Sequence, residues 1–421
     1  MTHSSWQNLA LAAALTFYLI LIGLFLINFG QIKWCDNFAI DYCAFWSGGR
    51  IINERSIAEV YDLGTLLQFQ KEIFPQATSP TFEPFAIMYL PVFIIPFKLI
   101  SIIQLPYSYL AWTMLNFFGF ILYLRFFVRK TTGKSLPLKI LLMMLVSFPV
   151  FQNLYLGQVS FWLGISAGEL MRAYLDDKPL KAGLWLGGWL LKPQLLVLIL
   201  PFLLLRRSMK VIFGFAISSV IAMVTSFALI GVDGFLDLAN TLFVAAGGGM
   251  ASNTEVMMNW RMLGWHIESL TSPTIGWAVI LVGTLLTVGV TGYVFRNRSS
   301  QEPTRLAVFL LGLFAATGAV TWHAHVHMSI ILIPPMILLL MKKRFNQYLF
   351  SVWVFVPIFV QIIIIAIIPF IELESSAFSI IEGLRGFILN LLILGWAVFH
   401  YNKAEEETHS ESMILNGKEL V

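Results

Sequence analysis

The chain has 421 residues, of which 58% are hydrophobic and 12% are charged, whereas an average soluble domain has about 25% charged residues. Its 27 Lys and Arg and 23 Asp and Glu residues are too few to coat a water-exposed surface of this size, and the mean hydropathy is +0.80. The composition argues against a cytosolic enzyme, a disordered chain and, with two cysteines, a secreted disulfide scaffold. The net charge of +4 gives no indication of a nucleic-acid partner.

The distribution of charge predicts where the chain crosses the membrane. Residues 9–29 form an apolar run, and no Lys, Arg, Asp or Glu occurs before Lys33. The length of this run is close to the ~20 residues that a helix needs to cross the hydrocarbon core. Because a basic start and a small-residue cleavage site are not evident, we expect an uncleaved first span. Further apolar runs lie at about residues 85–103, 107–127, 139–154, 158–171, 182–205, 211–232, 273–295, 306–321, 328–341, 348–371 and 383–401.

Five clusters of basic residues lie between these runs and contain 17 of the 27 Lys and Arg residues. The positive-inside rule places such loops in the cytoplasm. The segments at 31–83, 233–264 and 372–376 are then external, and the middle one has a single basic residue, Arg261. The clusters are Arg125, Arg129, Lys130, Lys134 and Lys139; Arg172, Lys178 and Lys181; Arg206, Arg207 and Lys210; Arg296, Arg298 and Arg305; and Lys342, Lys343 and Arg344.

The apolar run at 182–205 must enter the membrane and return if Lys181 and Arg206 are on the same side. Its central Lys192-Pro193 permits that turn, because proline removes a helix hydrogen bond and lysine resists the bilayer centre. A broken backbone at membrane depth is tolerated where it lines a protein cavity. We therefore expect a re-entrant segment here.

The run at 85–103, which Pro91 and Pro96 interrupt, must be re-entrant as well if Lys130 is cytoplasmic. The parity of the helices between residues 85 and 139 stays open on the sequence alone. The chain has no convincing internal repeat.

These features predict an all-α polytopic membrane protein with about ten to twelve membrane helices, some of them broken or re-entrant. We expect a single integral membrane domain over residues 1–401 and a cytoplasmic tail over residues 402–421. A long first external loop at 31–83 would carry interfacial helices, and 233–264 would form the second external loop.

With this topology, scattered polar groups converge on the outer face of the membrane. An outward cleft at the membrane boundary that holds acids, histidines and isolated cations is the default hypothesis for a functional site. The groups that we expect there are Asp36, Asp41, Arg50, Glu54, Arg55, Glu59, Asp62, Lys71 and Glu72 in the first loop, the turn Leu156-Gly157-Gln158, Lys192, the segment Asn259-Trp260-Arg261 and the segment from Trp322 to His327.

The acid and the histidines each have two interpretations. Asp41 follows a span, where an acid is often only a solvated or capping residue, and it is also a candidate catalytic carboxylate. His323, His325 and His327 resemble zinc ligands, but no acid lies near them in sequence to complete a set. On a helix His323 and His327 share a face while His325 points elsewhere. We expect at least one of the three to act in catalysis or substrate binding, the others to pack at the interface, and no metal.

Two cations and two cysteines are also informative. Lys192 lies within an apolar run, where a charge is expensive, and this favours a functional role. Arg261 lies in an external loop, and it either has such a role or extends its charge to the membrane surface. Cys35 and Cys43 are both external, and their pairing stays open because a spacing of eight residues does not decide it.

Several motifs of soluble enzymes are missing from the chain. It has no GxGxxG after a strand, no GxxxxGK followed by Ser or Thr and no HExxH. A soluble nucleotide donor therefore has no obvious binding site. An enzyme that acts outside the cytoplasm has no nucleotide sugars or ATP at hand, so a group donor there must be carried by the membrane.

Short motifs occur in an order that is similar to a known family of membrane enzymes. Together they resemble glycosyltransferase family 87, which comprises GT-C-type mannosyltransferases of the class that uses polyprenyl-phosphate-mannose and builds phosphatidylinositol mannosides. The likeness runs from about residue 35 to 340, with departures where Glu83 replaces a proline and where the histidines alternate instead of adjoining. The motifs are Asp41-Tyr42-x-Ala44-x-x-x-Gly48-Gly49-Arg50 with Val60-Tyr61-Asp62; Glu83-Pro84-Phe85 with Leu90-Pro91; Leu156-Gly157-Gln158-Val159; Ala182-Gly183-Leu184 and Gly187 with Leu191-Lys192-Pro193-Gln194; and Trp322 to His327.

The resemblance implies a GT-C-like bundle that transfers a hexose, with mannose as the expected sugar, from a polyprenyl-phosphate-sugar donor to a hydroxyl of a lipid-linked or glycan acceptor. It also implies inversion, no cofactor, no metal, and an active site on the extracytoplasmic side of the plasma membrane. The implied general base is Asp41, with His325 as its rival or partner. Lys192 and Arg261 would bind the donor phosphate. The residues implied in sugar or acceptor binding are Gln158, Trp322, His323, His327, Tyr42 and Arg50.

Two other classes of protein stay open. A transporter or flippase of a lipid or small solute also has many spans and polar groups at the midplane, but it usually shows repeated halves. A non-catalytic subunit of an envelope glycan assembly complex fits the departures from the family pattern. Membrane lipids are partners in every case, and the oligomeric state, the acceptor and the polyprenyl length stay open.

Overall fold

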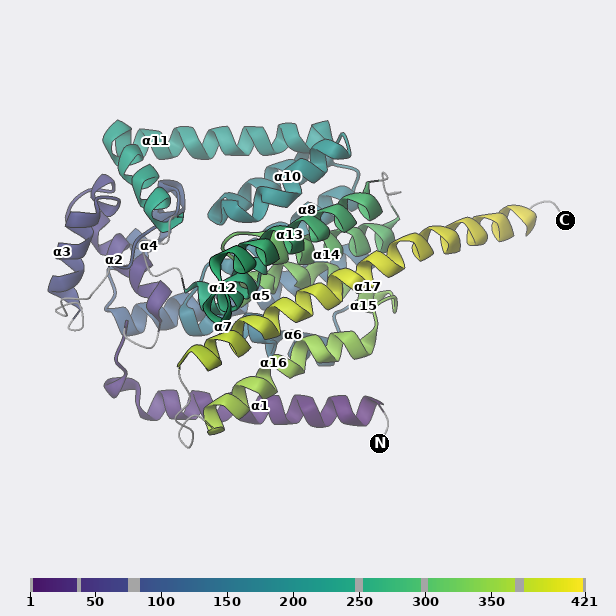
Figure 1. Cartoon of the computed structure of the whole chain (residues 1–421), viewed down its shortest axis with the longest axis horizontal. Coiled ribbons are helices and arrows are strands. Elements are labelled where there is room, and N and C mark those ends of the chain that lie inside the picture. The colour runs from purple at the N-terminus through teal and green to yellow at the C-terminus, as the bar shows by residue number, and fades with distance from the viewer. Residues whose placement is uncertain are drawn as a thin grey trace.

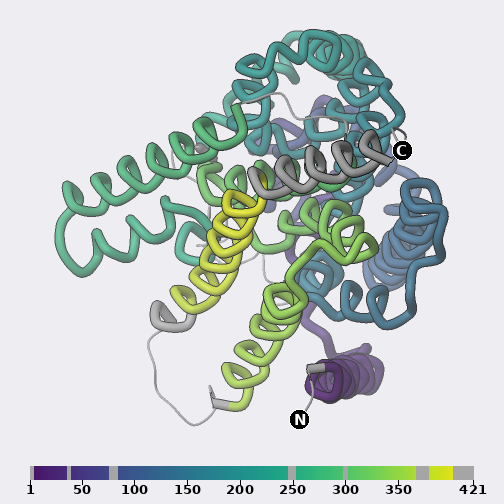
Figure 2. Tube along the Cα trace, turned by 90° about the vertical axis from the view of Figure 1, so that its right-hand side faces the viewer, coloured from purple at the N-terminus to yellow at the C-terminus, as the bar shows by residue number. Residues whose placement is uncertain are grey.

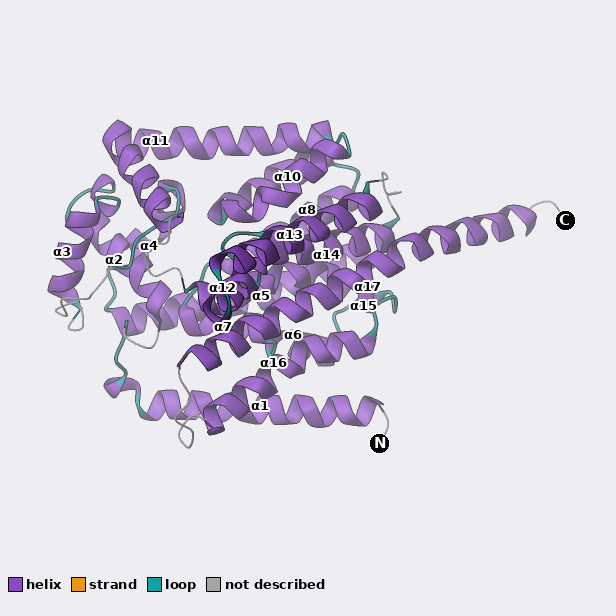
Figure 3. Ribbon diagram, in the orientation of Figure 1, coloured by secondary structure: helices purple, strands orange, loops and turns teal. Residues whose placement is uncertain are grey.

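The structure is a computed structural model of the chain, and it describes residues 3–35, 39–74, 84–246, 253–296, 302–367 and 375–418. Asp36 and Glu83 lie outside the described residues. The protein is 84% helical, and no strand occurs among the residues that are described (Figure 3). The expected all-α polytopic membrane fold is confirmed.

The helices follow one another with short connections, and most of them run along the long axis of the molecule (Figure 1). The α-helices are α1 His3–Ile27, α2 Ile40–Glu54, α3 Leu63–Ile73, α4 Pro91–Ile100, α5 Leu105–Thr132, α6 Leu138–Leu145, α7 Phe148–Leu156, α8 Ser160–Leu175, α9 Pro179–Leu186, α10 Leu196–Leu205, α11 Met209–Ala246, α12 Trp260–Leu270, α13 Pro273–Phe295, α14 Pro303–Val320, α15 Ile333–Met341, α16 Gln347–Ile367 and α17 Ser375–Lys418. The 3-10 helices are η1 Phe29–Gln31, η2 Ala58–Val60, η4 Gly187–Leu191, η5 Pro193–Leu195, η6 Thr254–Val256 and η7 Val326–Leu332.

Seven of the described helices are long and apolar enough to cross a membrane, or eight if the bent pair α6 and α7 forms one span. They are α1, α5, α11, α13, α14, α16 and α17. The sequence predicts about ten to twelve membrane helices. The numbers differ because the chain builds several apolar runs from short helices, among them Pro91–Ile100, Pro193–Leu205 and Val326–Met341.

The run at 182–205 turns back on itself. α9 packs along α11, with Gly183 against the carbonyl of Val211 and Gly187 against Ser218. The two helices therefore run in the same direction and begin at the same end of the bundle. α10 ends at Leu205, just before α11 begins, so it returns to that end after the chain reverses near Lys192.

The run at 85–103 forms α4, a helix too short to span, and the crossing is made by α5. Near the start of α5, the Trp112 Nε1 group donates a hydrogen bond to the carbonyl of Gly157 over 3.0 Å. Further along α5, Tyr123 packs against Gly168 in the second half of α8. α5 therefore leads from the end of the bundle near Gly157 to the opposite end.

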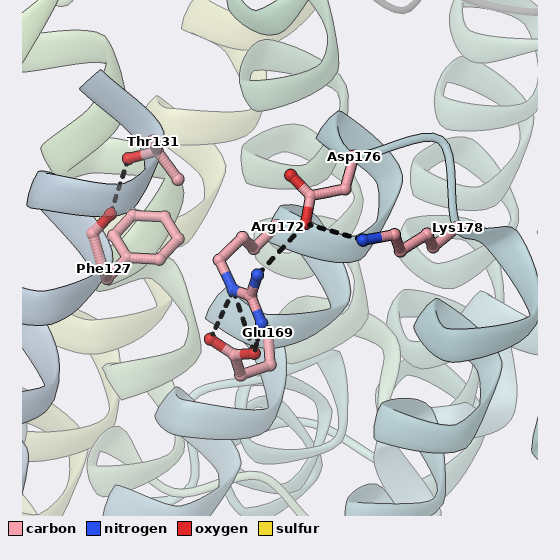
Figure 4. Close-up of polar contacts among 6 residues, drawn as sticks. All are labelled: Phe127, Thr131, Glu169, Arg172, Asp176 and Lys178. Atoms are coloured by element: carbon pink, nitrogen blue, oxygen red, sulfur yellow. Dashed lines mark hydrogen bonds and ion pairs between the residues drawn. The ribbon is translucent and has the colours of Figure 1, made fainter. Parts of the chain in front are cut away.

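That opposite end carries basic residues from several segments. The Arg206 guanidinium lies 4.0 Å from the centre of the Phe309 ring, and the Arg305 guanidinium lies 4.7 Å from that of Tyr401. At the end of α8, Arg172 pairs with Glu169 and, over 3.1 Å, with Asp176, which also lies 3.9 Å from Lys178 (Figure 4). These charges surround the connection between α8 and α9. Arg172 and Lys178 belong to one of the predicted cytoplasmic basic clusters.

The segment between α1 and α5 supplies most of a second, smaller core beside the main bundle, and residues of α5 and α11 complete it (Figure 1). α2 and α4 approach closely at Gly49, where any side chain would collide with the backbone of Phe97. The Asp62 carboxylate begins α3 by accepting a hydrogen bond from the Thr65 amide over 2.7 Å. Figure 2 shows α1 at the edge of the molecule.

Candidate active site

Asp41 lies in the first turn of α2. A disulfide between Cys35 and Cys43 fastens this turn to the end of the preceding segment, with the two Cα atoms 5.7 Å apart. Asp41 Oδ2 accepts a hydrogen bond from Gln158 Nε2 over 2.6 Å. The candidate base is therefore held by a residue from the distant turn between α7 and α8.

Gln158 is placed by the way in which α7 ends. Gly157 closes the helix with φ +69°, in the left-handed region that favours glycine. A side chain at Gly157 would also collide with the Cβ atom of Tyr42, so only glycine permits the close approach of α7 and α2. The hydroxyl of Tyr109 donates to the carbonyl of Leu154 over 2.5 Å and ties this helix end to α5. The glycine of the Leu156-Gly157-Gln158 motif is therefore needed both for the left-handed end of α7 and for the close contact of α7 with α2.

The surroundings of Asp41 suit a group that accepts a proton. Burial raises the pKa of its carboxyl, and the Gln158 hydrogen bond and the positive charge of Lys192 both oppose that rise. A carboxylate with a raised pKa takes up a proton more readily near neutral pH, as a general base requires.

Lys192 lies at the break between η4 and η5 and is 6% exposed. Its ammonium nitrogen lies 5.8 Å from the centre of the Tyr89 ring. The same charge acts on Asp41 and on the three histidines His323, His325 and His327. Lys192, at the turn of the re-entrant segment, is therefore close enough to interact with both the acid and the histidines.

Tyr89 belongs to this cluster, although sequence reasoning did not identify it. Its hydroxyl is close enough to Gln158 and Asp41 to interact with both, and its backbone carbonyl accepts a hydrogen bond from the Tyr61 hydroxyl over 2.7 Å. The only signal in the sequence was a tyrosine directly before Leu90-Pro91, and nothing local distinguishes it from a packing residue.

The three histidine rings lie in a row after α14, with His323 edge-on to His325 and His325 stacked on His327. The ring centres of His323 and His325 are 4.7 Å apart, and those of His325 and His327 are 5.9 Å apart. His327 is buried, with its Nδ1 atom 2.9 Å from the hydroxyl of Ser160, so it serves to hold the row in place. Burial lowers the pKa of His323 to about 4 and that of His325 well below its ordinary value, which keeps both imidazoles neutral at pH 7.

Arg261 and Trp322 form the rim of the cluster. The Arg261 guanidinium lies 4.4 Å from the centre of the Trp322 ring, and its charge also acts on His323. A second indole, that of Trp277, stacks on Trp322 with ring centres 5.8 Å apart. The Asn259 side chain begins α12 and donates to the carbonyl of Thr321 over 2.7 Å, which joins the two rim segments.

Tyr42 and Arg50, which are predicted sugar or acceptor contacts, make other contacts in the structure. Tyr42 is 0% exposed, its hydroxyl is 2.5 Å from that of Ser108, and its ring packs among aromatic residues of the smaller core. Arg50 forms an ion pair with Glu54. Consecutive helix residues are about 100° apart, so Tyr42 points away from the direction of Asp41, and Arg50, nine positions on, lies on the opposite face of α2.

The chemistry available to the cluster follows from its members. In the described part of the chain, no group of three or more His, Cys, Asp or Glu side chains is arranged to hold a metal ion. The site combines one carboxylate able to accept a proton, a buried ammonium group and a guanidinium at the rim. This set can deprotonate a hydroxyl and bind an anion that leaves with growing negative charge.

Comparison with protein families adds an independent finding. The model of glycosyltransferase family 87 matches residues 87–320, which is more than half of the chain. The matched segment contains Gln158, Lys192 and Arg261, and it ends just before Trp322. The chain matched none of the curated proteins and none of the solved structures with which it was compared.

Proposed function

This chain belongs to glycosyltransferase family 87 and is a membrane glycosyltransferase, and on that premise we propose that it transfers a hexose, with mannose as the expected sugar. The proposed donor is a polyprenyl-phosphate sugar, and the proposed acceptor is a hydroxyl of a lipid-linked or glycan molecule on the extracytoplasmic face of the plasma membrane. The observation that carries the proposal is the placement of Asp41, Gln158 and Lys192 in one cluster.

The proposed reaction is a single displacement at the anomeric carbon. The acceptor oxygen forms the new bond while the bond to the phosphate oxygen breaks from the opposite side, so the anomeric configuration inverts. The hydroxyl proton passes to the carboxylate of Asp41, with the neutral imidazole of His325 as rival or partner. The released polyprenyl phosphate carries away the bonding electrons as negative charge.

Lys192 and Arg261 are the proposed ligands of the donor phosphate. Lys192 is buried, so a phosphate beside it would bind a desolvated cation. The acid whose charge acts on Lys192 is Asp41. Arg261 stands at the rim, on the indole of Trp322. Because the charge on the phosphate rises as the sugar leaves, these two cations would stabilise the transition state more than the bound donor.

Gln158 and the rim residues take different parts in this proposal. Gln158 already donates to Asp41, so it orients the base, and its sugar-binding role becomes secondary. The half-exposed indole of Trp322 and the neutral imidazole of His323 remain proposed contacts of the sugar or acceptor, and the buried His327 supports them.

The membrane orientation is also part of the proposal. The disulfide between Cys35 and Cys43 supports an extracytoplasmic position for the Asp41 end of the bundle, because disulfides persist in oxidising compartments. The basic clusters near Arg172 and Arg206 at the opposite end support a cytoplasmic position there.

The proposal is tested by radiolabel transfer on membranes that contain the chain. Polyprenyl-phosphate-mannose labelled in the sugar should yield labelled product, whereas membranes without the chain should not. Labelled polyprenyl-phosphate-glucose in parallel identifies the sugar. Transfer from a nucleotide sugar alone, with the polyprenyl-phosphate sugars inert, would contradict the proposed donor.

A further inference from the structure

One helical turn of α17 contacts two segments that carry residues of the candidate site. On this turn, Gly383 lies against the carbonyl of Met257, two residues before Asn259, with no room for a side chain. Gly386 lies against Val326, which stands between His325 and His327 in sequence. The same turn carries Glu382 and Arg385, and it lies beyond residues 87–320 that match the family.

Arg385 is a buried cation inside a candidate membrane span. It is 6% exposed, and its guanidinium lies 3.8 Å from the centre of the Phe148 ring at the start of α7. Its Nη2 atom donates to Gln361 Oε1 over 2.8 Å and lies 3.4 Å from Glu382 Oε1. Its Nη1 atom donates to the carbonyl of Pro357 over 3.2 Å. The cation therefore joins α7, α16 and α17.

Glu382 extends this contact to a second residue of α7. Its Oε1 atom accepts a hydrogen bond from Gln152 Nε2 over 2.9 Å. The next residue, Asn153, donates from Nδ2 to the carbonyl of His327 over 2.9 Å. α7 is thus held on one side by α17 and on another by the histidine row, and it ends at the turn that carries Gln158.

From these contacts we propose that the α17 turn from Glu382 to Gly386 is a positioning element of the glycosyl-transfer site. Glu382 and Arg385 fix the rotation and depth of α7, and α7 sets where Gln158 holds Asp41. The glycines of the turn let the segments before Arg261 and around His325 close against the same helix. This inference rests on the proposed function, because its effect is on the proposed reaction.

The energetics favour such a role over simple packing. Charged groups inside a membrane span are costly, and they are usually found where function requires them. A well-packed apolar pair would join two helices as firmly, but it would not fix their rotation through directed hydrogen bonds. Small displacements of groups that contact the reacting atoms are expensive, since a shift of ~1 Å can cost about 100-fold in rate.

The test compares variants of the full-length protein in the polyprenyl-phosphate-mannose transfer assay. Gln152→Met removes the donor to Glu382 and keeps an apolar chain of similar length, so the fold is retained. We expect kcat to fall about 10-fold while KM for the donor changes less than about twofold. Glu382→Met should behave alike, and Glu382→Gln, which still accepts from Gln152, should recover most of the rate.

Two further readouts separate positioning from loss of stability. Glu169→Met removes the acid of a comparable Glu–Arg pair, three residues apart, at the opposite end of the bundle (Figure 4). This control should lower thermal stability and leave kcat within about twofold of the parent. Gln152→Met should also shift the acidic limb of the pH profile to higher pH. A weaker Gln158 hydrogen bond opposes the rise in the pKa of Asp41 less than the intact bond does.

The outcomes are distinct. A lower kcat in Gln152→Met and Glu382→Met, with rescue by Glu382→Gln and a shifted acidic limb, supports the positioning role. Wild-type kcat in Gln152→Met and Glu382→Met overturns the inference and leaves the proposed function standing. Equal losses in Glu169→Met, or loss without the shift in pH profile, also overturn it. A wild-type protein without transfer refutes the proposed function, and the inference falls with it.

Discussion

Gln158 Nε2 donates a hydrogen bond to Asp41 Oδ2 over 2.6 Å, although the two residues are 117 positions apart. Asp41 precedes the segment that matches the family, and Gln158 lies within it. The contact therefore ties the disulfide-fastened turn of α2 to the main bundle. It fixes the carboxylate beside Lys192, in surroundings that raise its pKa.

The pH dependence of transfer should reflect this contact. Asp41 must be deprotonated to accept a proton, so the rate should fall as the pH falls through its pKa. Gln158→Leu removes a hydrogen bond that lowers the pKa, and the acidic limb should therefore move to higher pH. The measurement is kcat against pH for parent and variant. An acidic limb that moves to lower pH, or does not move, would contradict the assignment of that limb to Asp41.

Lys192 should control donor binding and the charge on Asp41 together. Lys192→Met removes the buried cation and keeps the length of the side chain. We expect KM for the polyprenyl-phosphate donor to rise about 10-fold or more, because a charge-assisted contact to phosphate is lost. The acidic limb should also move to higher pH. Unchanged donor KM in this variant, measured beside Lys192→Arg, would remove Lys192 from the phosphate site.

Transfer should not depend on a divalent metal. Asp36 and Asp41 are five positions apart, which does not form the Asp-x-Asp pair that suits a shared divalent ion. We expect the rate to persist in excess chelator at concentrations that inhibit a metal-dependent control enzyme. Complete loss of transfer, restored by manganese or magnesium, would instead make the histidines and Asp36 candidate ligands.

The orientation in the membrane can be tested by cysteine labelling with an impermeant reagent. A chain that lacks Cys35 and Cys43 would carry either Ser208→Cys or Ser56→Cys. We expect Ser56→Cys to label from outside and Ser208→Cys only after permeabilisation, because Ser208 lies among the basic residues before α11. Labelling of Ser208→Cys in intact cells would reverse the proposed sidedness.

Much of the site could be predicted from the sequence, because the positions of charges and prolines limit where helices can turn. Basic clusters and Lys192-Pro193 predicted the reversal that brings Lys192 toward Asp41, and both residues lie in one cluster. Arg261 and Trp322 are likewise adjacent at its rim.

Other features have no local signal in the sequence. Tyr42 follows Asp41 directly, and only the rotation of α2 decides that one side chain faces Gln158 while the other is buried. Tyr89 joins the candidate site beside Lys192 and Gln158, and Gln158 lies 69 positions further along the chain. The Gln152–Glu382 contact joins residues 230 positions apart. Such contacts depend on how helices pack in three dimensions, which hydrophobic periodicity does not specify.

The general-base assignment also needs a matched set of variants. Asp36→Asn serves as the control for Asp41→Asn, since Asp36 lies five residues upstream, closer to the first span. His325→Ala is the counter-test. If the imidazole is the base, His325→Ala will be inactive while Asp41→Asn keeps a substantial rate. The acidic limb of the pH–rate profile of Asp41→Asn will then lie well below pH 6.5. If both variants are inactive, the two residues act as a unit.

The most direct test of the central claim is the rate of sugar transfer by Asp41→Asn under single-turnover conditions, with polyprenyl-phosphate-mannose already bound. The substitution preserves the size of the side chain and removes the charge that accepts the proton. The account predicts normal folding and near-normal donor binding, with a rate reduced about 100-fold or more, and an Asp36→Asn control near the parent rate. Near-normal transfer by both Asp41→Asn and His325→Ala would contradict the account and place the catalytic base elsewhere.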